Sequence, residues 1–215
     1  MADNIKAVIF DMDGVLQDSE TISDITWEMA AKEWGFELNY DILQACRGSN
    51  RHDIAMKLKE FYGEDFDSVS FLNRTSEFFY QIEAEKGIPL MHYAKEILEY
   101  LKPKYKLALA SSTRGVSVRR QMKAGGLIDF FESLTTGDMV EHSKPEPEIY
   151  LKAAESIGIK PEACVAVEDS PNGVKSAYAA GMRVIMVPDK IQPDENLKKL
   201  CWKICPSLED VKSVL

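Results

Sequence analysis

Residues 7–19 read Ala7-Val8-Ile9-Phe10-Asp11-Met12-Asp13-Gly14-Val15-Leu16-Gln17-Asp18-Ser19, an apolar run that ends in two aspartates. An apolar run without alternation is typical of a strand buried on both faces of a parallel sheet. Side chains two residues apart in a strand point the same way, so Asp11 and Asp13 face one site. Gly14 permits a tight turn away from the sheet. Two carboxylates held together repel, so a protein retains such a pair for metal binding or acid–base chemistry more readily than for packing.

The rest of the chain has two parts with different patterns. Between residues 20 and 87, apolar residues recur at helical spacing and glycines separate the segments, which predicts about four helices. From residue 89 onward, short apolar strands alternate with amphipathic helices, which predicts a parallel sheet covered on both faces. We therefore expect an α/β core domain built from residues 1–16 and 89–215, with residues 17–88 inserted as a helical domain.

The composition of the chain excludes several classes of function. The 215 residues are 45% apolar and 28% charged, as in ordinary soluble globular proteins, and the formal net charge is −9. This negative charge argues against nucleic acid or an anionic membrane as the main partner. The cysteines lack the spacing of zinc or redox motifs, the first residues lack a signal peptide, and no apolar run could span a membrane. We expect a cytoplasmic monomer that acts on a small molecule.

Polar residues recur where the predicted strands end. Ser111 follows one strand and Glu168 and Asp169 follow another, while Lys144 precedes a predicted helix. The carboxyl ends of parallel strands meet at one edge of a sheet, where ligands bind. Such an assembly suits phosphoryl transfer, in which one aspartate attacks phosphorus and a second moves protons. Mg²⁺ would offset the charge of the phosphoryl group, and a serine hydroxyl and a lysine ammonium would bind the remaining phosphoryl oxygens.

Four motifs resemble those of the haloacid-dehalogenase-like superfamily, in the same order and at similar intervals. They are Asp11-Met-Asp13-Gly14-Val15-Leu16, Ser111, Lys144-Pro145 and Glu168-Asp169-Ser170. The stretches LALASST, SKPEPEIY and VEDSPNGV are similar to the branch that contains β-phosphoglucomutase and sugar-phosphate phosphatases. The resemblance implies a Rossmann-like three-layer core with a parallel sheet and an inserted α-helical cap domain.

The resemblance also implies a role for each motif. Asp11 would be the nucleophile and Asp13 the general acid/base, with Ser111 and Lys144 binding the phosphoryl group. The implied Mg²⁺ ligands are Asp11, the backbone carbonyl of Asp13 and Asp169, with Glu168 in or next to that shell. The further residues implied to bind phosphate or substrate are Gly14, Gly48, Arg51, Ser112 and Arg114. Two alternatives stay open: Ser112 or Thr113 could cap the following helix, and Glu168 could support the metal ligands without binding the metal.

Together these patterns favour a Mg²⁺-dependent phosphatase that hydrolyses a small phosphorylated metabolite, such as a sugar phosphate, through an aspartyl phosphate. A β-phosphoglucomutase-like phosphomutase is the alternative, but it requires a cap histidine near Ser23, and no histidine occurs between Asp11 and His52. A dehalogenase needs neither Asp13 nor a metal, so the presence of Asp13 and Asp169 argues against this alternative. A non-catalytic binding protein would not need the nucleophile, the acid/base, the lysine and the metal acids together.

Overall fold

The computed structural model describes residues 4–47 and 51–215, and the chain divides into two compact units. Met1–Asp18 and Pro89–Leu215 make up the core unit, and Ser19–Ile88 make up the helical unit. Gln17 and Asp18, which the sequence pattern placed in the insertion, belong to the core unit because backbone hydrogen bonds hold them there. The carbonyl of Gln17 accepts from the N–H of Gly14 at 2.9 Å, and the N–H of Asp18 donates to the carbonyl of Pro89 at 2.9 Å.

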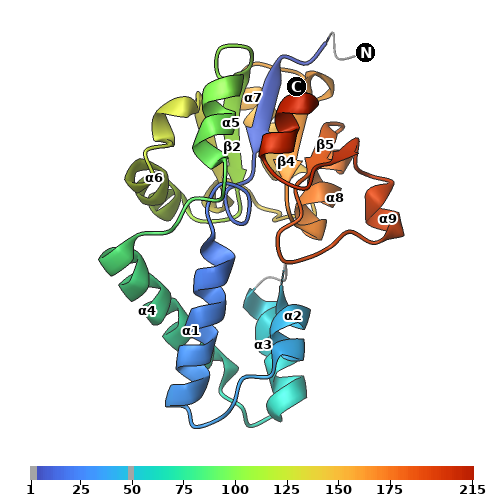
Figure 1. The fold of residues 1–215 in the computed structure, drawn as a ribbon. Coiled ribbons are helices and arrows are strands. Elements are labelled where there is room, and N and C mark those ends of the chain that lie inside the picture. The colour runs from blue at the N-terminus through green and yellow to red at the C-terminus, as the bar shows by residue number, and fades with distance from the viewer. Residues whose placement is uncertain (1–3, 48–50) are drawn as a thin grey trace. The chain divides into compact units, whose positions relative to one another are not determined.

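Over the described residues, the core unit contains a six-stranded sheet with the order β3-β2-β1-β4-β5-β6 and parallel pairing throughout (Figure 1). The strands are β1 (Ala7–Phe10), β2 (Lys106–Ser111), β3 (Ser133–Thr136), β4 (Cys164–Glu168), β5 (Arg183–Met186) and β6 (Lys203–Ile204). The chain runs from β1 to one side of the sheet and later continues from β4 to the other side. Strand order therefore reverses between β1 and β4, and ligands of such sheets bind beyond the carboxyl ends of the strands at that point.

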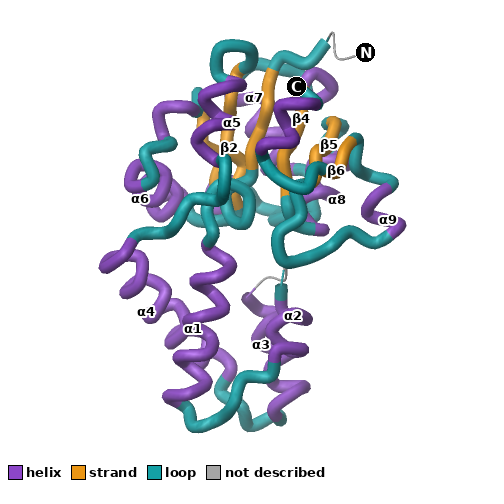
Figure 2. Tube along the Cα trace, in the orientation of Figure 1, coloured by secondary structure: helices purple, strands orange, loops and turns teal. Residues whose placement is uncertain are grey.

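Helices cover both faces of this sheet, as the purple segments around the orange strands show (Figure 2). The helices are α5 (Ala94–Leu101), α6 (Gly115–Ala124), α7 (Glu148–Ser156), α8 (Pro171–Ala179) and α9 (Glu195–Lys198), with 3₁₀ helices at Ile128–Phe130, Gly137–Met139, Pro161–Ala163 and Glu209–Ser213. Val8 and Phe10 pack with α5 and α6 on one face, and Ala7 and Ile9 pack with α7 and α8 on the other. Burial on both faces is the reason that β1 is apolar without alternation. The expected three-layer α/β fold is confirmed.

The helical unit has its own apolar core. Its helices are α1 (Ser19–Glu33), α2 (Tyr40–Cys46), α3 (Arg51–Tyr62) and α4 (Ser68–Lys86). The side chains of Asn39 and Asp67 accept hydrogen bonds from backbone N–H groups in the first turns of α2 and α4, which caps both helices. Trp27 and Phe71 meet edge to face in the core, with ring centroids 5.5 Å apart. None of the described helices is long and apolar enough to cross a membrane.

Candidate active site

Asp11 and Asp13 lie just beyond the end of β1. The backbone N–H of Asp11 donates to the carbonyl of Val167 at 3.0 Å, which extends the pairing of β1 with β4 past the strand. Asp11 is buried, whereas Asp13 is half-buried. The hydroxyls of Ser111, the last residue of β2, and of Thr113 donate to Asp13 Oδ2 at 3.4 and 2.9 Å. The two aspartates therefore have different surroundings, and hydroxyl groups hold Asp13.

Lys144 reaches Asp11 from the loop before α7. Its Nζ lies 2.6 Å from Asp11 Oδ1, 2.6 Å from Glu168 Oε1 and 3.1 Å from the carbonyl oxygen of Ala110. An ammonium has three N–H donors, so each donor of Lys144 has an acceptor here. Burial lowers the pKa of Lys144, but the carboxylates of Asp11 and Glu168 more than offset this and hold the pKa above its ordinary value. Lys144 therefore stays charged.

Glu168 is the last residue of β4 and is fully buried. Its Oε1 accepts hydrogen bonds from Lys144 Nζ and from the hydroxyl of Tyr150, which lies 2.7 Å away. Its Oε2 accepts from the backbone N–H groups of Asp169 and Ser170, at 3.1 and 3.3 Å, and from the Ser170 hydroxyl at 3.1 Å. Hydrogen bonds from several directions thus hold the carboxylate in one orientation.

Two glycines leave room for the carboxylates of the site. Gly14 has a φ of +74°, and a Cβ at this position would lie 2.3 Å from Asp169 Oδ2. A Cβ at Gly173 would lie 1.8 Å from Glu168 Oε1. Real Cβ atoms do not approach other atoms so closely, so larger residues at these positions would displace Asp169 or Glu168. The glycines of the DGVL and SPNGV stretches are thereby explained.

The site carries more negative than positive charge. Asp11, Asp13, Glu168 and Asp169 contribute carboxylates, and Lys144 contributes one ammonium. Burial raises the pKa of Asp11 above its ordinary value, the nearby carboxylates of Glu168 and Asp13 add to the rise, and the ammonium of Lys144 opposes it. Asp11, Glu168 and Asp169 each offer a carboxylate oxygen within 4.8 Å of the others. Mg²⁺ binds carboxylate oxygens, so this excess of charge and this donor set fit Mg²⁺.

Comparison with known proteins identifies the family. A family model described as haloacid dehalogenase-like hydrolase matches residues 8–187. The chain belongs to this family. The phosphorylated carbohydrates phosphatase of Thermotoga maritima is 31% identical over 188 residues, covering 84% of each chain. Hexitol phosphatase A of Escherichia coli is 31% identical over 188 residues, covering 85% of this chain and 82% of its own.

A solved structure shows the same fold. The β-phosphoglucomutase of Clostridium difficile superposes with a TM-score of 0.76 at 20% identity, covering 97% of this chain and 96% of that one. The predicted resemblance and the predicted enzyme class are therefore confirmed: the chain is a haloacid dehalogenase-like phosphoric monoester hydrolase.

In this hydrolase, the three residues that follow Ser111 differ in their exposure to solvent. Ser112 and Arg114 are exposed, whereas Thr113 is half-buried against Asp13. The first turn of α6 is capped by Asp138, whose Oδ1 accepts from the N–H of Gly115 at 2.8 Å. Capping by Ser112 or Thr113, which the sequence left open, is not seen, since α6 has no side-chain cap from its own N-terminal segment.

Two predicted substrate-binding residues belong to the helical unit. Arg51 is exposed at the start of α3 and donates to Asn73 Oδ1 at 2.7 Å and to Ser76 Oγ at 3.3 Å. Both partners are on α4, so the guanidinium joins two helices of the same unit. Gly48 lies outside the described residues.

The helical unit also contains a polar pocket of about 150 Å³. Arg47 lines this pocket, with a side chain that is 6% exposed, and forms ion pairs of 2.6 Å with Glu20 and Asp24. Ser23 and Trp27 also line the pocket. Two acids around one arginine give the described pocket walls a net negative charge.

Sequence reasoning missed two side chains that contact the site. From the sequence, Thr113 is only a candidate helix cap, but in the structure the side chains of Thr113 and Ser111 both reach Asp13. Tyr150 ends the SKPEPEIY stretch, and its sequence pattern gives it no role at the site. A tyrosine on the inner face of a helix usually packs in the core, and only the structure shows its hydroxyl on Glu168.

Proposed function

We propose that this haloacid dehalogenase-like hydrolase is a Mg²⁺-dependent phosphatase that cleaves a sugar phosphate through an aspartyl-phosphate intermediate. The observation that carries the proposal is the buried carboxylate of Asp11 at the end of β1, 2.6 Å from the charged Lys144 Nζ. A carboxylate beside a fixed cation suits attack on phosphorus, because the cation stabilises the charge on the phosphoryl oxygens.

The different surroundings of the two aspartates support different roles. Asp11 attacks the phosphorus atom, and the bond between phosphorus and the ester oxygen breaks. Asp13, held by Thr113 and Ser111, gives a proton to the leaving oxygen. Asp13 then takes a proton from the water that attacks the aspartyl phosphate, which releases inorganic phosphate and restores Asp11. Ser111 and Lys144 bind the transferring phosphoryl group.

We propose that Asp11, the backbone carbonyl of Asp13 and Asp169 hold Mg²⁺, with Glu168 in or next to that shell. When bound, the ion offsets the repulsion among these acids and polarises a phosphoryl oxygen. Two observations support this assignment: the clustered carboxylate oxygens of Asp11, Glu168 and Asp169, and the space that Gly14 leaves for Asp169.

The names of the two relatives support a carbohydrate substrate. One of the two is named a phosphorylated carbohydrates phosphatase and the other a hexitol phosphatase. Ser23 stands near the place where the resemblance to phosphomutases implies a histidine, which favours hydrolysis over transfer back to the sugar.

Phosphate release from a panel of sugar phosphates, with Mg²⁺ and with a chelator, tests the proposal. We expect release only with Mg²⁺, its loss in Asp11→Asn, and full activity in the control variant Asp129→Asn, which changes an exposed acid of the same unit. Full activity in Asp11→Asn would contradict the nucleophile assignment. Conversion of β-glucose 1-phosphate to glucose 6-phosphate without release would instead establish the phosphomutase.

A further inference from the structure

Tyr150 is a buried polar side chain that the proposed reaction does not use. It lies on α7, and its hydroxyl donates to Glu168 Oε1 at 2.7 Å. Its ring also faces the lysine, since Lys144 Nζ lies 5.1 Å from the ring centroid. Tyr150 therefore contacts both members of the ion pair between Lys144 and Glu168.

Lys144 must change one partner during the proposed reaction. Its three N–H donors are directed at Asp11, Glu168 and the carbonyl of Ala110. Once Asp11 has formed its bond to phosphorus, the carboxylate has lost its charge and is a weaker acceptor. The donor directed at Asp11 is then free to bind a phosphoryl oxygen, while the bond to Glu168 remains. Lys144 thus keeps its hydrogen bond to Glu168 while the ammonium changes its partner from Asp11 to the phosphoryl group.

The position of Glu168 depends on both of its oxygen atoms. Its Oε2 is held by the Asp169 and Ser170 backbone, but its Oε1 is held by Lys144 and Tyr150. Gly173 lies against the carboxylate and supplies no further donor side chain. Without the Tyr150 hydroxyl, the fully buried Oε1 would keep Lys144 as its described donor and hold the ammonium more tightly.

We propose that Tyr150 is a positioning residue, whose hydroxyl holds Glu168 so that Lys144 can turn from Asp11 to the phosphoryl group. This inference rests on the proposed function, because the phosphoryl group is its ligand. Hydrogen-bonding partners behind the groups that contact a ligand commonly change activity by about 10- to 100-fold when they are removed.

A double-mutant cycle tests the inference with two readouts. Tyr150→Phe is made in the wild type and in Glu168→Gln, and each protein is assayed for kcat/KM and, by calorimetry with Mg²⁺, for affinity toward inorganic phosphate. The matched control is Tyr105→Phe, which removes a hydroxyl that donates to the carbonyl of Leu215 at 3.3 Å. Melting temperatures show that each variant is folded.

We expect Tyr150→Phe to lower both quantities roughly tenfold in the wild type. In Glu168→Gln it should change them by less than about twofold, because groups that act through one another are not additive. Values equal to those of Tyr105→Phe, or equal losses in both backgrounds, would overturn the inference. A wild type that binds phosphate but releases none from any ester would overturn the proposed function alone, since the phosphate readout still decides on Tyr150. A wild type that does neither would overturn both.

Discussion

Replacing Lys144 by methionine tests whether this lysine neutralises two buried carboxylates. Its Nζ lies 2.6 Å from both Asp11 Oδ1 and Glu168 Oε1, and the side chains of Lys144, Asp11 and Glu168 are 8%, 10% and 0% exposed. Methionine keeps a long apolar side chain but removes the charge. Removing one partner of a buried ion pair costs about 3–5 kcal/mol, because the remaining charge is left without compensation.

The free-energy cost of proton uptake gives a similar estimate of the lost stability. Without the ammonium, one further buried carboxyl must bind a proton to stay in the folded protein. For a carboxyl with an unfolded pKa of about 4, this costs about 4 kcal/mol at pH 7 and about 1.4 kcal/mol at pH 5. The folded pKa is raised above the unfolded pKa, so the folded state binds more protons and the variant loses stability as pH rises. The stability deficit is therefore larger at pH 7 than at pH 5.

Thermal unfolding with a chelator present, at pH 7 and pH 5, measures this deficit. Each 1 kcal/mol shifts the melting temperature of a protein of this size by about 2–4 °C, so Lys144→Met should melt about 8–16 °C below wild type at pH 7 and about 3–6 °C below at pH 5. In the control Lys106→Met, the lost pair with Glu132 is 3.1 Å long and half exposed, and such pairs contribute less than about 1 kcal/mol. A deficit no larger than that of the control at pH 7, or the same deficit at both pH values, would refute the reasoning.

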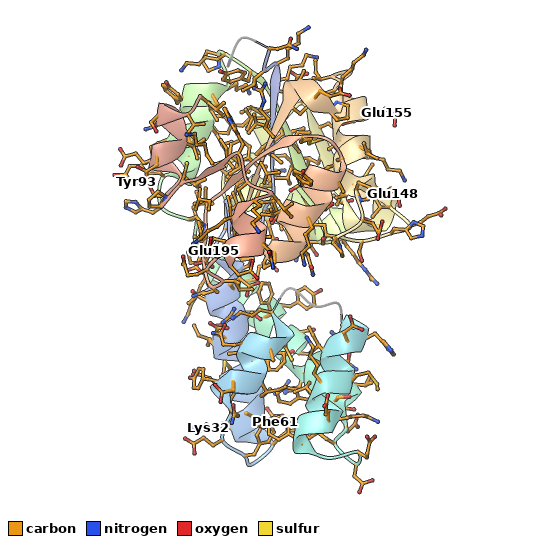
Figure 3. The ribbon with its side chains drawn as sticks, turned by 90° about the vertical axis from the view of Figure 1, so that its right-hand side faces the viewer. Lys32, Phe61, Tyr93, Glu148, Glu155 and Glu195 are labelled. Carbon is orange, nitrogen blue, oxygen red and sulfur yellow. The ribbon has the colours of Figure 1, made fainter. Side chains whose placement is uncertain are left out.

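Two further predictions concern the supports of the site. Gly14→Ala should weaken Mg²⁺ binding about tenfold by calorimetry, because the new Cβ displaces Asp169. Gly126→Ala should leave the Mg²⁺ affinity unchanged, since Gly126 has a similar φ of +67° and open space around it. Equal Mg²⁺ affinities of the two variants would contradict the metal role of Asp169. Glu148→Gln should lower the melting temperature at pH 7, since Lys152 and two backbone N–H groups hold the pKa of Glu148 (Figure 3) at about 2, below its ordinary 4.5. That stability is present above pH 4.5 and lost as pH falls toward 2, so a difference in melting temperature that stays constant down to pH 3 would contradict this role.

Much of the candidate site could be predicted because its residues follow strands with a strong local pattern. Asp11 and Glu168 come directly after continuous apolar runs, and burial on both faces of a parallel sheet requires such runs. Ser111 was expected just after its strand and is its last residue, which leaves it at the same edge of the sheet. The surroundings of Thr113 and Tyr150 could not be predicted, because their partners come from distant parts of the chain.

By itself, the sequence determined the α/β fold, the family and the kinds of chemical group at the site. These properties follow from local patterns, since strand burial and tight turns are recorded in neighbouring residues. Only the tertiary structure decided which groups pair. Lys144 donates to Asp11 across 133 residues of sequence, and Tyr150 selects Glu168 as its acceptor. Such pairings depend on how α7 packs against one face of the sheet, and no spacing within the chain records that packing.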